Sequence, residues 1–190
     1  MKILIAISSK KYSSQTLDVG MSVAKAFSAK TTIVDVGDKI NQFSLKEVGV
    51  ARERMESWDL DRPGIDVLEW AFDFLSENEF IEKNEIESGF PKNTLIERGG
   101  RRSEVFLKGT VCDDVSLILR NGEIIEELIS EVQKEVYDVT IIGKSQNSKK
   151  YYVLSQYIDS SIFIVNNYKP DRNYKVLLAI YELPGIKKAI

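Results

Sequence analysis

The chain has 190 residues and a mass of 21.6 kDa, enough for one domain with a sizeable core but few for two domains of average size. Apolar residues at 43% and charged residues at 29% indicate a folded protein, and the net charge of −3 gives no electrostatic reason to expect nucleic-acid or membrane-surface binding. The chain has no histidine, which excludes Ser-His-Asp and Cys-His catalysis and every His-ligated metal site.

The start of the chain predicts a strand, a helix and a second strand. Ile3–Ile7 is a short, almost continuous apolar run, typical of a strand buried on both faces. A polar loop follows over Ser8–Ser14, in which Ser13 or Ser14 would accept a free backbone N–H at the start of the helix. Thr31–Val36 predicts the second strand. The residues at helical spacing between the strands are Leu17, Gly20, Met21 and Ala24.

The next segment predicts one or two helices. A helix is possible around Leu45–Trp58. Asp61, Arg62 and Pro63 then supply a capping carboxylate and an early proline, which are signals of a helix start. The apolar residues that would share one face of this helix are Ile65, Leu68, Phe72 and Leu75.

Residues 76–111 differ in character, and we expect them to be an insertion on the domain. The stretch Glu77–Glu87 is acidic and predicts a solvated helix face rather than a metal site. Gly99-Gly100 lies between the strand-like segments Thr94–Glu97 and Ser103–Leu107, which predicts a hairpin. The cluster of Arg98, Arg101 and Arg102 around the two glycines is expected to be an exposed hairpin end, without the aromatic side chains that nucleic-acid stacking requires.

The alternation of strands and helices resumes after the insertion. A strand at Val115–Leu119, a turn at Asn121-Gly122 and a helix are followed by a strand at Val139–Ile142, a loop to Lys150, a helix at Tyr151–Ile158 and a strand at Ile162–Val165. The residues expected to face inward on the first of these helices are Ile125, Leu128, Ile129, Val132 and Val136.

This alternation predicts a doubly wound α/β fold with a mainly parallel sheet and helices on both faces. In such sheets ligands bind beyond the carboxyl ends of the strands, near the point where the strand order switches. The expected ligand-binding segments are therefore Ser8–Ser14 and Gly143–Lys150.

Lys175–Ile180 repeats the pattern of Lys2–Ile7 with four of six residues identical. We expect residues 168–174 to be a linker and residues 175–190 to begin a second copy of the domain that ends early.

The order of these elements resembles the universal stress protein family. Lys2–Ala26 follows the family's opening strand, loop and helix, Val115–Gly122 matches a later strand unit, and Tyr137–Gly143 matches its Asp-aliphatic-Gly strand closely. The resemblance covers about residues 1–36, 60–76 and 113–167, and it begins again at residue 175. It implies a five-stranded sheet of the adenine-nucleotide alpha hydrolase type over residues 1–167, carrying the inserted helix and hairpin.

The resemblance also implies a nucleotide pocket that has degenerated. ATP-binding members carry Gly-x2-Gly-x9-Gly-Ser/Thr after the fourth strand, and here only Gly143 matches, with Gln146 at the second glycine. Ser8 stands where the family's first strand ends in an acid. No cofactor is expected, although weak binding of ATP or AMP is possible. The residues assigned to the pocket by the resemblance are Ala6, Ile7, Ser8, Val36, Gly143, Lys144, Ser145 and Lys149.

The resemblance leads to a non-catalytic stress-response module that dimerises and acts through protein contacts. The dimer is expected to form through the last strand, Ile162–Val165, or through the extra strand, Val176–Ile180. The alternative is an ATP- or AMP-binding sensor that uses Gly143–Lys150 as a variant phosphate loop. An enzyme of the related superfamily is not expected, because Ser8–Lys11 lacks the glycines of a pyrophosphatase loop.

The remaining features concern the protein's surroundings. Cys112 is the only cysteine, which fits a reducing cytoplasm, and its acidic neighbours do not favour a reactive thiolate. No apolar run is long enough to span a membrane, and the first residues do not resemble a signal peptide. We therefore expect a cytoplasmic protein without membrane or nucleic-acid partners.

Overall fold

The computed structural model describes residues 1–37, 64–81, 93–110, 114–144, 148–169 and 172–173. The predicted helix at Leu45–Trp58, the helix start at Asp61–Pro63, Cys112, Ser145 and the second copy with its strand Val176–Ile180 lie outside these ranges. The strands are β1 (Lys2–Ile7), β2 (Lys30–Gly37), β3 (Thr94–Glu97), β4 (Arg102–Phe106), β5 (Val115–Asn121), β6 (Val139–Gly143) and β7 (Ser161–Val165). The helices are α1 (Lys10–Ala26), α3 (Ile65–Glu77), α4 (Ile124–Lys134) and α5 (Ser148–Tyr157).

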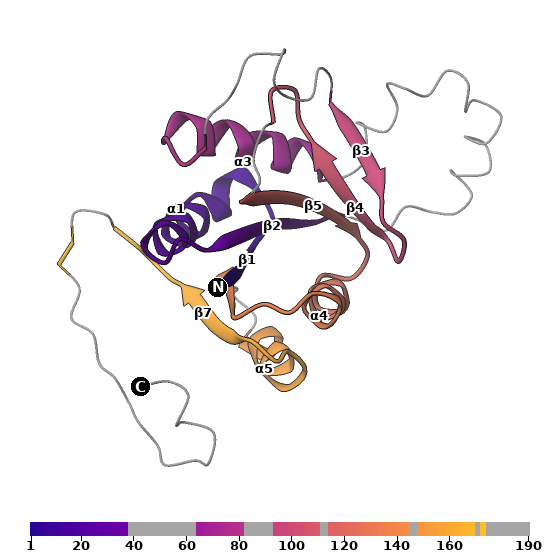
Figure 1. Ribbon diagram of the computed structural model, residues 1–190. Coiled ribbons are helices and arrows are strands. Elements are labelled where there is room, and N and C mark those ends of the chain that lie inside the picture. The colour runs from indigo at the N-terminus through magenta and orange to yellow at the C-terminus, as the bar shows by residue number, and fades with distance from the viewer. Residues whose placement is uncertain (38–63, 82–92, 111–113, 145–147, 170–171, 174–190) are drawn as a thin grey trace.

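The described strands form one seven-stranded sheet in the order β3-β4-β5-β2-β1-β6-β7 (Figure 1). Five neighbouring strands run parallel, as predicted, namely β5, β2, β1, β6 and β7. The other two, β3 and β4, are antiparallel to their neighbours. The expected number of five strands is therefore corrected to seven. The inserted hairpin joins the sheet because β4 pairs with the edge of β5, whose backbone groups would otherwise lack partners on that side.

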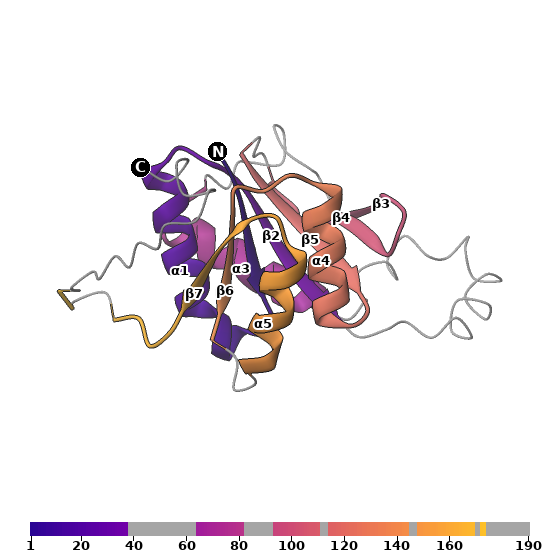
Figure 2. The ribbon, with the colours of Figure 1, turned by 90° about the horizontal axis from the view of Figure 1, so that it is seen from below.

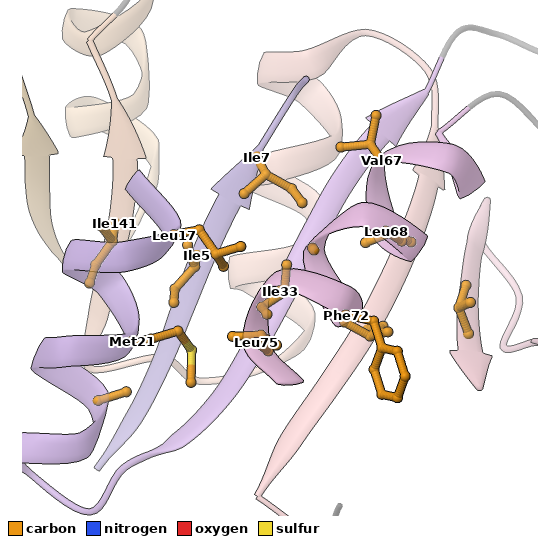
Figure 3. Close-up of a cluster of buried hydrophobic side chains, with 14 of the residues drawn as sticks. Ile5, Ile7, Leu17, Met21, Ile33, Val67, Leu68, Phe72, Leu75 and Ile141 are labelled. Atoms are coloured by element: carbon orange, nitrogen blue, oxygen red, sulfur yellow. The ribbon is translucent and has the colours of Figure 1, made fainter. Parts of the chain in front are cut away.

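Helices cover both faces of the sheet, which confirms the doubly wound prediction. Figure 1 shows α1 and α3 on one face and α4 and α5 on the other, and Figure 2 views the sheet from the side of α4 and α5. Figure 3 shows the core beneath α1 and α3, where Ile5 and Ile33 of the sheet meet Leu17, Leu68 and Leu75 of the helices. The core under α4 and α5 is formed by Leu4, Val34, Ile118, Leu128, Val132, Tyr137, Ile142, Leu154 and Ile158.

The first helix begins earlier than its polar sequence indicates. It starts at Lys10, with Ser9 at the N-cap position, so neither Ser13 nor Ser14 caps it. The Ser13 hydroxyl lies inside the first turn and accepts the backbone N–H groups of Ser8 at 2.9 Å and Ser9 at 3.2 Å. The expected loop Ser8–Ser14 is thus only two residues long, because Ser13 ties the end of β1 to the helix.

The inward face of α4 also differs from the prediction. The helix ends at Lys134, so Val136 lies beyond it and is 83% exposed rather than buried. Glu127 and Glu131 are fully buried instead. Arg120 of β5 compensates both carboxylates, with Nε 2.9 Å from Glu127 Oε2 and Nη1 2.8 Å from Glu131 Oε2.

The hairpin end is exposed at Arg98–Arg101, as expected, but two of its arginines also form ion pairs with α4. Arg101 Nη2 lies 3.0 Å from Glu127 Oε1, and Arg102 Nε lies 3.0 Å from Glu131 Oε2. The left-handed backbone of Gly99 and Gly100 turns the chain so that these arginines meet α4. The hairpin is therefore attached to the domain by ion pairs to buried carboxylates as well as by the sheet.

Candidate functional site

The switch in strand order lies between β1 and β6, because the chain builds outward from β1 in both directions. A shallow groove of about 320 Å³ opens beside this point, on the side of α1. Its lining combines the first turns of α1 with the ends of β6 and β7. The residues that matter for its chemistry are Lys11, Tyr12, Gln15, Gly143 and Lys144.

The groove is suited to an anion. Lys11 and Lys144 are both exposed and bring two positive charges to it. The first turn of α1 contains no acidic residue, and the Ser9 side chain makes no capping hydrogen bond. The N–H groups at this helix start therefore keep a partial positive charge that favours a phosphate or carboxylate. Tyr12 adds an aromatic surface to the groove. It is 73% exposed, and its ring centroid lies 5.3 Å from Lys11 Nζ.

Gly143 lies at the groove, and packing explains why it is a glycine. A Cβ there would lie 2.7 Å from Thr16 Oγ1, so α1 approaches β6 too closely for a side chain. The Gly143 carbonyl accepts the hydroxyl of Tyr151 at 3.0 Å. Burial raises the pKa of Tyr151, which keeps this hydroxyl protonated as the donor.

The residues assigned to the nucleotide pocket do not gather in one place. Gly143 and Lys144 line the groove, and Ser8 lies directly before α1 with its N–H bonded to Ser13. Ile7 is only 4% exposed and points into the core beneath α1 and α3, so its side chain does not belong to a pocket (Figure 3). The reason is the alternation of side chains along β1, which places Ile7 on the same face as Ile5.

Ala6 and Val36 project to the opposite face of the sheet. They are partly buried and pack against the core under α4 and α5, where Tyr151 packs as well. Lys149 is an exposed residue of α5, and Ser145 lies outside the described residues. The ring of Tyr151 thus packs against the same core as Ala6 and Val36, the two residues that the resemblance assigned to the nucleotide pocket.

Sequence reasoning did not single out Asp35, the buried carboxyl group near the end of β2. Asp35 is 2% exposed, and its Oδ1 has no hydrogen-bond partner among the described residues. Burial, followed by the charge of Asp66, raises its pKa to about 7, although the N–H of Val36 opposes this shift. The available signal was an acidic residue inside the apolar run Thr31–Val36.

None of the described helices is long and apolar enough to cross a membrane. The described residues also contain no group of three or more histidine, cysteine, aspartate or glutamate side chains arranged to hold a metal ion.

Comparison with known proteins identifies structural relatives only. No protein-family model and no curated protein sequence matches the chain. A universal stress protein solved in complex with cAMP has a TM-score of 0.53 at 11% identity, over 88% of this chain and 98% of that one. A universal stress protein from Archaeoglobus fulgidus has a TM-score of 0.49 at 10% identity, over 87% of this chain and 98% of that one. A protein of the universal stress protein family from Burkholderia pseudomallei has a TM-score of 0.47 at 14% identity, over 86% of this chain and 94% of that one.

At these identities the likeness shows the fold. The sheet with helices on both faces is a universal-stress-protein-like fold, as the order of elements in the sequence predicted.

Proposed function

We propose that the protein is a non-catalytic stress-response module of the universal stress protein type, located in the cytoplasm, which forms a homodimer and acts through protein contacts. The fold it shares with a universal stress protein supports the class. The absence of histidine from the sequence supports a binding role, since no serine has an imidazole base to activate it.

One observation carries this proposal, namely the surface of β7 at the edge of the described sheet. β7 pairs with β6 on one side only. Two large apolar side chains of this strand are exposed, Phe163 by 46% and Ile164 by 44%, and they project from opposite faces. An edge strand with apolar side chains is a template for pairing with a second strand. A second copy of β7 would cover both residues at once.

The test is a measurement of molecular mass in solution by sedimentation equilibrium. We expect a dimer for the natural chain and a monomer for Ile164→Lys, because a charge on the paired strand would lose its hydration in the dimer. The matched control is Val136→Lys, which changes an exposed apolar residue away from β7 and should leave the dimer intact.

Two outcomes would contradict a dimer formed through β7. The first is a monomeric natural chain at high micromolar concentration. The second is an Ile164→Lys variant that still dimerises. A dimer that survives this substitution but is lost when residues 174–190 are removed would place the contact in the extra strand Val176–Ile180 instead.

The second candidate function is a nucleotide sensor, and the groove beside β6 favours it. The structural relative with a TM-score of 0.53 was solved with cAMP. In this chain the groove of about 320 Å³ combines Lys11, Lys144 and an uncapped helix start, which suit a phosphate group. Gly143–Lys150 would then act as a variant phosphate loop for ATP, AMP or cAMP.

Isothermal titration with AMP, cAMP and ATP with magnesium tests the sensor. We expect micromolar dissociation constants, weakened about tenfold by Lys144→Gln, since a charge-assisted hydrogen bond contributes about 1.5–3 kcal/mol. Lys25→Gln is the control, because it removes the same charge from an exposed position at the other end of α1. An absence of binding to all three nucleotides would exclude the sensor and leave the dimer proposal standing.

A further inference from the structure

A second groove lies at the other end of the sheet, near the amino ends of the parallel strands. It has a volume of about 450 Å³ and runs between the hairpin and the end of α4. The charged side chains that line it are Lys2, Arg98, Arg102, Glu104, Lys134 and Glu135. Its floor carries two hydroxyl groups from neighbouring strands, those of Thr32 and Ser116.

The inserted hairpin is what creates this groove. β4 lies antiparallel to β5, with Arg102 opposite Arg120 and Glu104 opposite Ile118. This register puts the charged side chains of β4 on the same face as α4, whose last residue is Lys134. Without the hairpin, the side of the groove that carries Arg98 and Arg102 would not exist.

Arg102 is held in place by a buried set of charges. Its side chain is 12% exposed, and its Nε lies 3.0 and 3.2 Å from the two oxygens of Glu131. Glu131 is fully buried and is itself fixed by Arg120 Nη1 at 2.8 Å and by the Tyr137 hydroxyl at 3.0 Å. The guanidinium of Arg102 is therefore pre-organised, which lowers the entropy lost when a ligand binds.

The groove has more positive than negative charge. Four cationic side chains line it, against two carboxylates. Arg98 Nη2 lies 2.7 Å from Glu104, and Lys2 Nζ lies 2.6 Å from Glu135, while Lys134 Nζ reaches a backbone carbonyl at 3.4 Å. The hydrogen bond from Lys2, together with the charges of Lys2, Arg102 and Lys134, lowers the pKa of Glu135, so the field there already favours an anion.

We propose that this groove binds the phosphate group of a small soluble molecule, a phosphate monoester. The excess of two positive charges matches the charge of about −1.5 to −2 that such a group carries at neutral pH. Arginine and lysine together provide directed and adaptable donors for phosphate oxygens. The hydroxyl of Ser116 supplies a neutral partner between the charges, whereas the Thr32 hydroxyl is already hydrogen-bonded to Tyr137.

The test uses inorganic phosphate as the probe, with the full isotope-labelled chain followed by nuclear magnetic resonance. Sodium chloride is adjusted so that the ionic strength stays constant, which removes general screening effects. We expect saturable shifts of the amide signals of Lys2, Thr32, Arg102 and Ser116. Chloride alone should not produce them.

Substitutions that should weaken phosphate binding and one that should strengthen it make the test specific. Arg98→Gln and Lys134→Gln should each weaken phosphate binding about tenfold, as expected for one lost charge-assisted contact. Glu104→Gln should strengthen it, since this change releases Arg98 from its carboxylate partner. Lys108→Gln is the matched control, because this exposed lysine lies outside the groove and its loss changes the net charge equally.

Three results would overturn the proposal. One is an absence of saturable shifts in the groove residues. Another is an equal loss of affinity in Lys108→Gln and Arg98→Gln, which would indicate a general charge effect. Shifts confined to Gly143 and Lys144 would also overturn it, since they would place the phosphate in the groove beside β6. These variants change exposed side chains, apart from the partly buried Glu104, and circular dichroism checks that each one is folded.

Discussion

Asp35 shows how one buried acidic residue couples folding to pH. Its pKa in the folded protein is about 7, against an ordinary value of 3.8. Below about pH 3 the carboxyl group is protonated in both the folded and the unfolded chain. As the pH rises to 7, the unfolded chain loses this proton first, so the free energy of unfolding falls through that interval. The contribution of Asp35 to stability is present in acid and lost at neutral pH.

We therefore expect Asp35→Asn to stabilise the protein at pH 8 by up to about 4 kcal/mol, the equivalent of a shift of about three pKa units, and to change it little at pH 4. Urea unfolding at the two pH values measures this difference. Asp159→Asn, at an exposed position, is the control and should follow the natural chain. Equal effects of Asp35→Asn at both pH values would refute the coupling.

Gly143 lies where α1 packs so closely against β6 that a side chain would not fit. We expect Gly143→Ala to destabilise the protein by about 1–3 kcal/mol, because the added Cβ would lie 2.7 Å from Thr16 Oγ1. Combination with Thr16→Ala should recover part of this loss, since the second change removes the atom that is hit. Thermal unfolding of both single variants and the pair gives the coupling energy. A strictly additive pair would contradict the packing explanation.

At the scale of elements, α4 and β5 are joined by buried charges as well as by apolar contacts. We expect Arg120→Met to destabilise the protein by about 3–5 kcal/mol, because the change leaves Glu127 and Glu131 without their buried counter-ion. Arg98→Met, which breaks the partly exposed pair with Glu104, should change stability by less than about 1 kcal/mol.

Denaturant unfolding of the two variants compares these ion pairs directly. Similar losses in both would mean that burial does not distinguish them. Arg101 and Arg102 of the hairpin contact the same two carboxylates. A large loss of stability in Arg120→Met would therefore indicate that this set of buried charges also helps to attach the hairpin to the domain.

For the whole molecule, the proposed dimer links stability to concentration. If β7 pairs with a second copy, the unfolding temperature should rise as protein concentration increases, by mass action. The Ile164→Lys variant should show no such rise, and Val136→Lys should behave like the natural chain. Calorimetry over a hundredfold range of protein concentration measures this rise in the unfolding temperature. Over that range, mass action changes the free energy of unfolding by about 2.7 kcal/mol. A concentration-independent natural chain would argue against the dimer.

The local sequence patterns predicted the fold class and most of the helices and strands that the structure describes. The apolar runs of β1, β2, β5, β6 and β7 are local patterns, and so are the helical spacing in α3 and the two glycines of the hairpin. Of the predicted site residues, Gly143 and Lys144 line the groove beside β6, because they follow a recognisable strand. Lys11 and Tyr12 lie within the expected ligand-binding segment Ser8–Ser14, but their polar surroundings indicated a loop where α1 already begins.

How these elements pack against one another depends on contacts between residues that are distant in the sequence. The hairpin joins the sheet because β4 finds the free edge of β5, and Arg120 can be buried because α4 brings two carboxylates to it. The direction of Ile7 and the pKa of Asp35 likewise depend on what packs against them. Hydrophobic periodicity reports the local conformation of the chain, whereas burial, ion pairing and pKa depend on residues distant in the sequence, which no local pattern contains.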